Sequence, residues 1–509
     1  MDTLVLSRLF HPTREGGHGL ESWGYRLGFK KGSYGSSEGA WDSYSPEMLQ
    51  YCINDVQLNE KVYSRLKSES RGFTGQAVQL EHSVAKIIDQ QRRTGFLLNQ
   101  KKCMLLVAEL QEKIEQVQSE VHETFKPKII KNVLVPKYTK SGTTAKTAVN
   151  SEGNGVRLTE KEYDTIREHG KVTRTTVIDF NLASRKQIGE YLVEFGWKPK
   201  NRTPTGQPIV DEGTLNKVKN IPEAAMIAKY LMLQKRLAQI KSWLKEVDDN
   251  TDRVHGYVNP NGAVTSRMTH SHPNMAQIPS SKSPYGPECR SCWTVPKGYK
   301  LVGIDASGLE LRMLAHEMND EAYTNEILNG DIHTANQKLA GLESRNQAKT
   351  FIYALNYGAG DAKLGSVVGG NREAGKRLRE RFFSSLPSFK TLKDRVSREA
   401  ASGSIKALDG RKLTVRSEHA ALNTLLQGNG AIVMKQALIY LDNKIKSKGI
   451  DAKFVANVHD EWQLEVKEDQ ADAVGRLGVQ ALRETTCTFK LNCPLDGEYN
   501  VGDNWYETH

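Results

Sequence analysis

Residues 454–466, FVANVHDEWQLEV, are the most informative stretch of this 509-residue sequence. Two short runs rich in β-branched and aromatic residues flank a His-Asp-Glu tip. This pattern is typical of a β-hairpin that carries carboxylates at its turn. Because carboxylates crowded at one turn repel one another, the arrangement favours a bound cation. Asp460, at the centre of the tip, is the first candidate ligand.

A second strand end lies upstream, in residues 300–310, KLVGIDASGLE. A short apolar strand ends on Asp305, and the chain bends through Ser307 and Gly308 toward a helix. Asp305 and Asp460 together suit a pair of hard divalent ions about 3.5–4 Å apart, the spacing of two-metal phosphoryl transfer. Taken alone, each aspartate fits a solvated loop residue better than a ligand, so the metal interpretation depends on the rest of the chain.

Composition and charge favour a polyanionic partner. Lysine and arginine number 71 against 60 aspartates and glutamates, a net charge of +11. Basic proteins without such a partner are also common, so this balance is only suggestive. The length predicts three or four domains. No apolar run is long enough to cross a membrane and the N-terminus lacks a signal-peptide pattern, so we expect no membrane span and a cytoplasmic location.

The six cysteines do not indicate a disulfide framework in a chain of this length. Cys289 and Cys292 have the spacing of zinc ligands, but no second cysteine or histidine pair completes a site. The sequence therefore does not predict zinc.

Helical patterns dominate the chain before the basic segment that begins at Lys126. Ser45-Pro46-Glu47 is a good helix start, with a cap residue followed by proline. That helix carries Tyr51 and Asp55 on one face, which suits either a surface helix or a fragment of a metal-dependent nuclease. Apolar residues keep a helical period from 76 to 93, and Asn99 caps another long amphipathic helix.

The segment from Lys126 to Ser151 has six lysines, no acidic residue, and interspersed Pro, Gly, Ser and Thr. This composition predicts a basic, flexible insertion that packs little apolar surface. Three interpretations stay open: a solvated loop, a contact with the DNA backbone, or a docking site for an accessory protein.

Two later helices carry polar groups suited to nucleotides. Residues 344–357 predict a helix with Arg345, Lys349 and Tyr353 on one face, closed by Gly358. Such a face is often merely solvated, but two cations beside an aromatic ring also suit phosphates below a stacked base. The helix from residue 420 to 440 carries Asn423 and Gln427. These amides are either buried structural groups or readers of the minor-groove acceptors that every base pair presents.

In combination, these motifs resemble those of family A DNA polymerases, most closely the replicative enzymes of T7-like phages. DASGLELR at 305–312 is similar to motif A, residues 345–358 to motif B, and VHDE at 458–461 to motif C. VNPNGAVTSR at 258–267 extends the likeness, which runs from Asp2 to the Asn504-Trp505 ending. Three ordered motifs at compatible spacings are far more specific than any one of them.

The resemblance implies a template-directed DNA polymerase that uses two Mg²⁺ ions, for which Mn²⁺ can substitute. It implies that the metals are held by Asp305, Asp460 and the Ala306 carbonyl, and that Arg345, Lys349 and His333 grip the triphosphate. Tyr353 is implied to stack by the incoming nucleotide, and Glu310 to block a 2′-hydroxyl. Primer–template contacts are implied for Arg267, Asn423 and Gln427, with His459 and Glu461 supporting the primer end.

Two departures from the family pattern affect the expected activities. Of the family's proofreading motifs only the Tyr-x3-Asp motif is present, as Tyr51 and Asp55. With one carboxylate left, we expect no 3′–5′ exonuclease from this chain alone; a separately encoded exonuclease half is one explanation. The basic insertion, residues 126–176, occupies the place where the phage enzyme binds host thioredoxin, but it is shorter and different. The expected partners are primer–template DNA, dNTPs, a helicase-primase and a processivity factor bound at this insertion. If the chain is phage-encoded, it is expected to act in the host bacterial cytoplasm.

The expected fold is an α+β, multidomain right-hand polymerase. Its parts are an exonuclease-like remnant (1–70), thumb (71–252), palm (253–320 and 401–509) and fingers (321–400). Three other functions fit the sequence less well. A non-catalytic DNA-binding protein is disfavoured by both aspartates and the cationic helix, and a nuclease by the incomplete motif set in segment 1–70. An RNA polymerase is disfavoured by Glu310.

Overall fold

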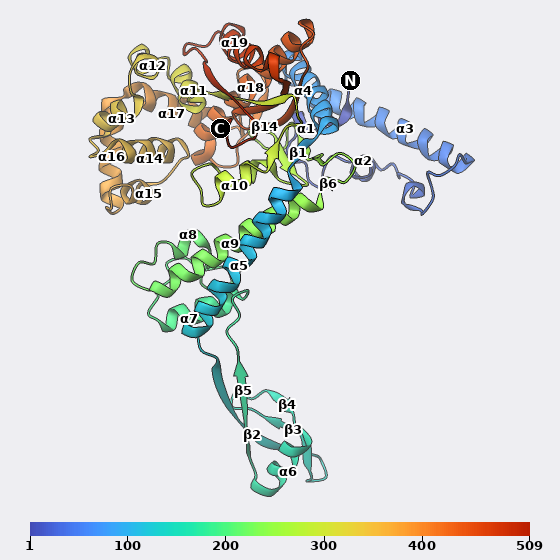
Figure 1. Cartoon of the computed structure of the whole chain (residues 1–509), viewed down its shortest axis with the longest axis vertical. Helices are drawn as coiled ribbons and strands as arrows, with labels where there is room; N and C mark the ends of the chain where they lie inside the picture. Colours follow the sequence, from blue (N-terminus) through green and yellow to red (C-terminus); the bar gives the residue numbers. More distant parts are fainter. The chain divides into compact units, whose positions relative to one another are not determined.

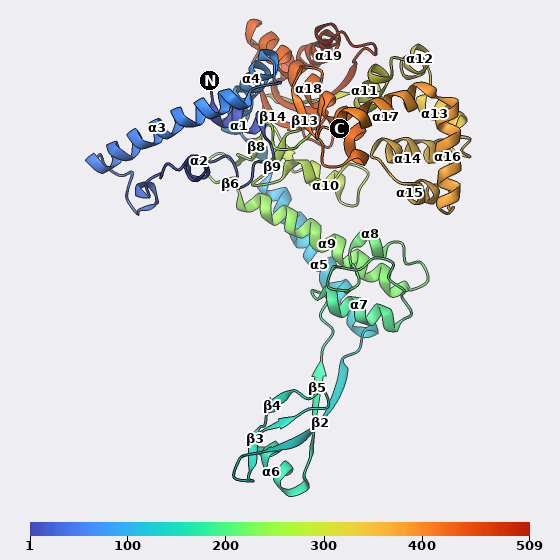
Figure 2. The same ribbon diagram turned by 180° about the vertical axis from the view of Figure 1, so that it is seen from behind.

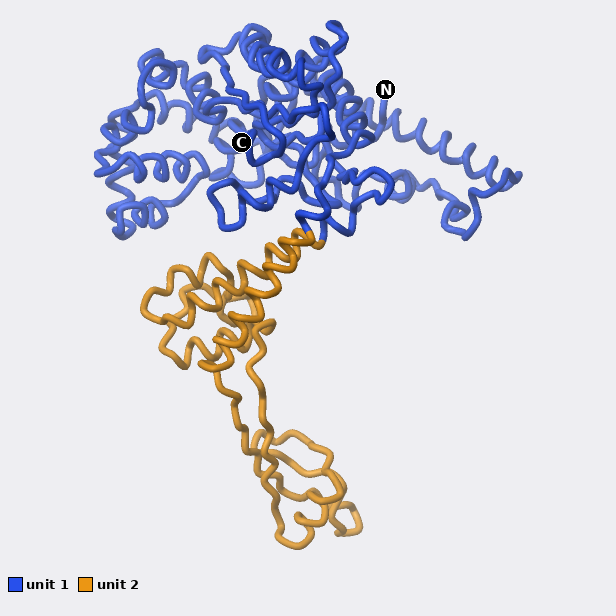
Figure 3. The backbone as a smooth tube through the Cα atoms, viewed as in Figure 1, with its two compact units in different colours: residues 1–103, 242–509 blue, residues 104–241 orange.

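The computed structural model describes all residues, 1–509, and the chain forms two compact units. Unit 1 comprises residues 1–103 and 242–509, and unit 2 comprises residues 104–241 (Figure 3). The chain passes between them within helices α5 (Gln100–Thr124) and α9 (Pro222–Lys245). All catalytic, metal-binding and DNA-binding residues expected above belong to unit 1. None of the helices combines the length and hydropathy that a membrane span requires.

A four-stranded antiparallel sheet with the strand order β14-β15-β11-β16 is at the centre of unit 1. Its strands are β11 (Tyr299–Ala306), β14 (Ala452–Val458), β15 (Glu461–Lys467) and β16 (Gly497–Gly502). Only His459 and Asp460 separate β14 from β15, which confirms the predicted hairpin. His459 adopts a φ of +56°, in the left-handed region where histidine is tolerated better than most residues. Asp305 pairs with Glu461, so this register brings the end of β11 beside the hairpin turn.

Helices cover this sheet and build the largest hydrophobic core. They include α4 (Gly75–Thr94), α11 (Leu309–Met318), α18 (Ala421–Ser447) and α19 (Ala471–Phe489). Helix α4 lies against β14 and α18, and α19 lies against β11 and β16. Ile304 and Leu464 of the sheet are fully buried in this core. Each such side chain stabilises the fold by about 1.5–3 kcal/mol relative to an exposed one.

A group of helices lies on one side of unit 1, as the two opposite views show (Figures 1 and 2). It contains α12 (Glu321–Asn329), α13 (Ile332–Ala340), α14 (Arg345–Asn356), α15 (Asp361–Ser366), α16 (Arg372–Ser385) and α17 (Pro387–Ala400). A Ser344–Gln347 capping box begins α14. Gly358 follows the C-terminal end of α14 and has a φ of +74°. A Cβ at this position would lie 1.9 Å from the His419 carbonyl oxygen, so only glycine fits.

The N-terminal segment contributes α1 (Thr3–Phe10), α2 (Leu20–Leu27) and α3 (Pro46–Glu69). Ser45 caps α3 by accepting from the Met48 amide, as the sequence predicts. A small separate core holds these helices together; its buried members are Leu6, Trp23, Leu58, Val62 and Leu66. This part of the chain is therefore folded and not an extended tail.

Short elements complete unit 1. A second sheet has the order β10-β1-β7-β6, and two small ribbons pair β8 with β9 and β12 with β13. The bounds are β1 (Phe96–Leu98), β6 (Val247–Asp248), β7 (Arg253–Val254), β8 (Tyr257–Asn259), β9 (Thr269–Ser271), β10 (Trp293–Thr294), β12 (Ser404–Lys406) and β13 (Lys412–Thr414). Helix α10 covers Gly286–Arg290, and the 3₁₀ turns are Tyr34–Ser36, Met275–Gln277, Glu418–Ala420 and Glu468–Gln470.

Unit 2 contains the basic insertion, and of the three interpretations left open by the sequence, the solvated loop is wrong. The insertion folds as an antiparallel sheet of order β4-β3-β2-β5, with β2 (Lys128–Tyr138), β3 (Thr144–Val149), β4 (Gly155–Arg157) and β5 (Val172–Ile178). Leu134, Ala148 and Leu158 of this region are buried together with Ile166 of α6 (Glu160–His169). These few apolar side chains are enough to form a small core because they converge on one face of the sheet. Helices α7 (Arg185–Glu194) and α8 (Glu212–Leu215) belong to the same unit.

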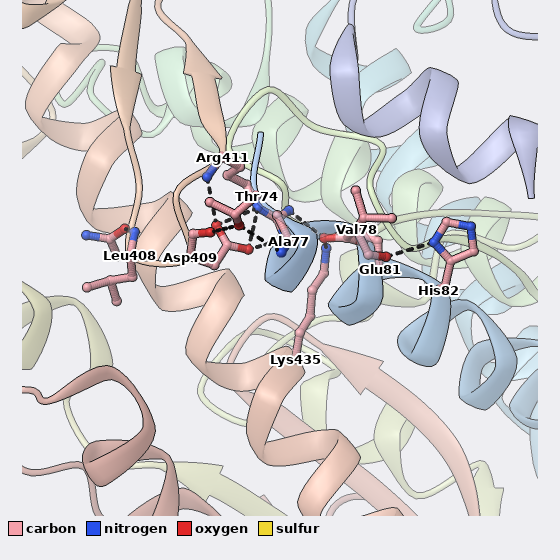
Figure 4. A network of polar contacts seen from close by, with 10 residues as sticks. Thr74, Ala77, Val78, Glu81, His82, Leu408, Asp409, Arg411 and Lys435 are labelled. Atoms are coloured by element: carbon pink, nitrogen blue, oxygen red, sulfur yellow. Dashed lines mark hydrogen bonds and ion pairs between the residues drawn. The ribbon is translucent and has the colours of Figure 1, made fainter. Parts of the chain in front are cut away.

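A buried ionic network joins α4 to α18 and to the loop between β12 and β13 (Figure 4). Arg411 donates to Glu81 Oε1 at 2.5 Å and to Asp409 Oδ2 at 2.7 Å, and Lys435 donates to Glu81 Oε1 at 2.7 Å. All four side chains are at most 2% exposed. Although burial alone raises the pKa of Glu81, Lys435 and Arg411 hold it below its usual range. Two anions and two cations therefore neutralise each other within the core.

Candidate active site

Asp305 and Asp460 meet at one edge of the central sheet. Asp305 is the penultimate residue of β11, and Asp460 is the second residue of the hairpin turn. The backbone links the two segments, because the Ala306 amide donates to the Asp460 carbonyl at 2.9 Å. The antiparallel register, and not sequence proximity, brings these two residues together from distant parts of the chain.

The two carboxylates share an environment that disfavours their charges. Asp305 reaches solvent on one side, but partial burial raises its pKa to about 7, and the charges of Asp460 and Glu461 add to this effect. Burial also raises the pKa of Asp460. Carboxylates destabilised in this way are stabilised by a bound cation, so the site suits a divalent ion.

Glu461 is held by contacts that the sequence patterns did not reveal. It accepts from Gln463 Nε2 and Trp505 Nε1, each at 2.5 Å, and pairs with His509 Nδ1 at 2.9 Å. Burial alone raises the pKa of Glu461, but these partners hold it below its usual range. Its carboxylate is thus committed to neighbours in the chain. The role of Glu461 at the primer end stays a prediction.

Glu310 is the centre of a second polar cluster. From the first turn of α11 it accepts from Arg267 Nη2 at 3.1 Å, from the Tyr357 hydroxyl at 3.2 Å, and from Gln427 Nε2 at 3.5 Å. Gln427 also donates to the Tyr357 hydroxyl at 3.1 Å. The structure therefore brings Arg267, Glu310 and Gln427 together. Tyr357, which ends α14, joins them and was not among the expected site residues.

Helices α13 and α14 present the cations. Arg345 is the first residue of α14, with Lys349 and Tyr353 each one turn further along. The rings of His333, on α13, and Tyr353 lie 6.4 Å apart between centroids. Burial lowers the pKa of His333, and the nearby charges of Arg345 and Lys349 lower it further, which favours the neutral imidazole. These four side chains converge, as a triphosphate site requires.

Asp331, a residue not expected in this site, completes the cationic cluster. Its Oδ2 accepts from Arg345 Nε at 2.7 Å. The sequence marks Asp331 only as a good N-cap residue, because it directly precedes the helix that begins at Ile332 and carries His333. Sequence gives no reason to pair it with Arg345, which begins the next helix.

The remaining expected residues are placed less tightly. Asn423 is half-buried on α18, one turn before Gln427, and His459 is exposed at the hairpin turn. Near the N-terminus, Asp55 Oδ2 pairs with Lys31 Nζ at 3.4 Å, and that ammonium lies 5.3 Å from the centre of the Tyr51 ring. The charged neighbour of Asp55 is thus a cation and not a second carboxylate.

No three acidic, histidine or cysteine side chains converge anywhere in residues 1–509 in a way that would hold a metal by themselves. At the sheet edge the candidate protein donors are the two aspartates and backbone carbonyls, and Glu498, the register partner of Asp305 on β16, adds a further carboxylate nearby. Oxygen donors of this kind suit Mg²⁺, which normally keeps open positions for substrate phosphates and water. The donor set therefore fits a metal that is completed by its substrate.

Paired strand-end carboxylates beside a helix face with two cations are typical of enzymes that transfer phosphoryl groups on polyanionic substrates. Residues 155–507 match the family model "DNA polymerase family A". This chain belongs to DNA polymerase family A and is a DNA-directed DNA polymerase.

Similar proteins agree with this assignment over the whole chain. The DNA-directed DNA polymerase of Enterobacteria phage T3 is 35% identical, over 100% of this chain and 88% of that enzyme. The DNA-directed DNA polymerase of Escherichia phage T7 has the same identity and coverage. Among solved structures, the polymerase domain of Pol1 from M. smegmatis, in complex with DNA primer-template and dNTP, matches with a TM-score of 0.76. That match covers 99% of this chain and 82% of the other at 19% identity, and it shows a shared fold.

Proposed function

We propose that this chain extends a primer 3′-hydroxyl by templated addition of dNTPs, with two Mg²⁺ ions held by Asp305, Asp460 and the Ala306 carbonyl. The observation that carries the proposal is the junction of β11 with the hairpin turn, where two destabilised carboxylates share one site. When bound, such ions lower the pKa of the primer hydroxyl and neutralise charge on the departing pyrophosphate. Mn²⁺ suits the same oxygen donors.

The cationic cluster is proposed to bind the triphosphate. Arg345 offers a planar guanidinium for bidentate contact with phosphate oxygens, and Lys349 adds a point charge one turn away. His333, whose pKa is lowered by burial and by the charges of Arg345 and Lys349, can donate or accept a hydrogen bond there as a neutral imidazole. Tyr353, half-buried beside it, supplies the ring for the sugar and base of the incoming nucleotide.

Arg267, Asn423 and Gln427 are proposed to contact the primer–template. Arginine and amide side chains suit the minor-groove acceptors shared by all base pairs, so these contacts sense pairing geometry without reading sequence. Gln427 and Arg267 already meet at Glu310, which places them within one contact of the proposed nucleotide site. His459 and Glu461, on either side of Asp460, support the primer end.

Glu310 is proposed to exclude ribonucleotides, because its carboxylate is fixed by three donors and cannot easily yield to a 2′-hydroxyl. We expect Glu310→Ala to raise rNTP incorporation relative to dNTP by roughly 10–200-fold. Glu310→Gln, which keeps the size of the side chain, should retain most of the discrimination. The ratio of single-turnover efficiencies for rGTP and dGTP measures both. Equal discrimination in wild type and Glu310→Ala would refute this role.

We propose that this chain does not remove nucleotides from a 3′ end. The support is the Lys31–Asp55 pair, which neutralises the carboxylate of the Tyr51-x3-Asp55 motif. A polypeptide segment carrying the other nuclease carboxylates is the proposed complement of residues 1–70. Exposed apolar side chains on α1 and α3, among them Leu4, Leu49, Ile53 and Val56, suit a contact with it.

The sheet in residues 126–176 is proposed to dock a processivity factor. One face of this sheet covers its small core, whereas Ile129, Val133 and Val135 remain exposed among lysines. A mixed apolar and basic surface suits a protein partner with acidic character. Three further expectations stay predictions from the resemblance. They are contact with a helicase-primase, action in the host cytoplasm, and the boundaries of the thumb (71–252), palm and fingers.

Primer extension by the full chain tests this function. With Mg²⁺ and a labelled primer–template, we expect a single dNTP to be added only when it is complementary to the first unpaired template base. Without dNTPs the primer should keep its length. Extension that ignores the template, or none despite DNA binding and an added processivity factor, would refute the polymerase proposal. Shortening of the primer without dNTPs would refute the nuclease proposal alone.

A further inference from the structure

We infer that Asp331 is a positioning residue for the incoming nucleotide: it holds the Arg345 guanidinium in one orientation, with both terminal nitrogens free for phosphate oxygens. This inference rests on the proposed triphosphate role of Arg345 and adds a residue that the sequence motifs do not contain. It makes the cationic cluster a preformed site in the absence of substrate.

The Asp331 carboxylate is itself fixed in place. As the N-cap of α13 it accepts from the His333 amide at 3.0 Å and the Thr334 amide at 3.4 Å through Oδ1. Its Oδ2 accepts from the Thr334 hydroxyl at 2.9 Å. A carboxylate held at a helix N-terminus also interacts favourably with the helix dipole. The same Oδ2 is therefore a rigid acceptor for Arg345.

Arg345 meets this acceptor through Nε alone, at 2.7 Å. It makes no other hydrogen bond or ion pair in the chain, so its two Nη groups keep all four of their N–H donors. A guanidinium anchored through Nε presents its Nη groups in a defined direction, which suits phosphate binding. The side chains of Arg345 and Asp331 are 53% and 43% exposed, so this ion pair contributes little to the stability of the fold.

The charges around the Asp331–Arg345 pair favour binding of a triphosphate by an anchored Arg345. Lys349 lies one turn beyond Arg345 without an ion-pair partner, and the His333 ring lies beside both cations. Without Asp331 the long Arg345 side chain would have no anchor, and binding a triphosphate would cost the entropy of ordering it. An anchored Arg345 avoids most of that cost before the nucleotide arrives.

The test compares Asp331→Asn with Asp320→Asn in single-turnover incorporation. Asn is as good an N-cap as Asp, so both variants retain their helix starts. Asp320 is the matched control because it caps α12, accepts from the Tyr323 amide at 2.9 Å and the Ser388 hydroxyl at 2.7 Å, and pairs with no cation. We expect Asp331→Asn to raise the half-saturating dNTP concentration about threefold to tenfold, with the maximal rate within about twofold. Asp320→Asn should change neither quantity more than about twofold.

A double-mutant cycle with Arg345→Ala separates this inference from the proposed function. If Asp331 acts through Arg345, Asp331→Asn should have no further effect on dNTP affinity once Arg345→Ala has weakened it. An unchanged or tighter dNTP affinity in Asp331→Asn overturns the inference, and so does the same loss in the Arg345→Ala background. If Arg345→Ala itself leaves dNTP affinity unchanged, the proposed role of Arg345 fails, and the inference fails with it. Equal thermal midpoints in all variants establish that the fold is intact.

Discussion

Asp460→Ala should lower the rate of templated nucleotide addition by at least about 10³-fold. The substitution removes one of the two aspartates proposed to hold the divalent ions, so these ions would lose half of their proposed side-chain ligands. Metal ions stabilise the charge of this transition state by several kcal/mol, and a loss of about 1.4 kcal/mol corresponds to a tenfold lower rate. Single-turnover incorporation with saturating dNTP and Mg²⁺ measures the loss.

The appropriate control is Asp469→Ala, which removes an exposed carboxylate just beyond the end of β15. It should retain the wild-type rate within about twofold, because this side chain has no partner and does not face the site. DNA affinity should be nearly unchanged in both variants, since other residues are proposed to contact the primer–template. If Asp460→Ala lost less than about tenfold in rate, Asp460 would not be a metal ligand.

Arg411→Met should lower the free energy of unfolding by about 3–5 kcal/mol, the usual cost of breaking a buried ion pair from one side. The variant keeps the apolar stem of the side chain but removes the guanidinium, which leaves Glu81 and Asp409 with only Lys435 as a cation. Both carboxylates are at most 1% exposed, so water cannot replace the lost donors. Denaturant-induced unfolding, followed by the fluorescence of the buried tryptophans, measures the change.

Arg93→Ala is the matched control for this prediction. Arg93 also pairs with a carboxylate, Asp89, at 2.8 Å, but the two side chains are 77% and 43% exposed. Exposed pairs contribute about 0–1 kcal/mol, so this variant should be nearly as stable as the wild type. If the two variants lost the same stability, the buried network would not be what secures α4 to α18.

Local sequence predicted those parts of the fold and site that depend on local physics. The hairpin at residues 454–466, the strand ending at Asp305 and the capped helix bearing Arg345 all follow from short-range periodicity, caps and turns. Their roles in binding stay predictions. That Asp305 lies beside Asp460 required the strand pairing itself, which the sequence alone suggested only through shared chemistry.

The features that escaped prediction depend on contacts distant in the chain. His509, at the end of the sequence, reaches Glu461 in the hairpin, and Asp331 reaches Arg345 in the following helix, with no periodic pattern to link either pair. The sequence suggested a flexible insertion because lysines and turn residues outnumber a few apolar positions there. The structure instead shows a sheet. Those apolar positions, including Leu134 and Ala148, become a core only when the strands pair and α6 covers them.

The central claim, that Asp305 and Asp460 jointly hold the divalent ions of DNA synthesis, is tested most directly by counting bound Mn²⁺. Electron paramagnetic resonance of the free ion gives this number for the full chain with a dideoxy-terminated primer–template and the next complementary dNTP. The wild type should bind two more ions than an Asp305→Asn/Asp460→Asn double variant under the same conditions. Equal Mn²⁺ binding by the two proteins would contradict the account, because the ions would then be held elsewhere.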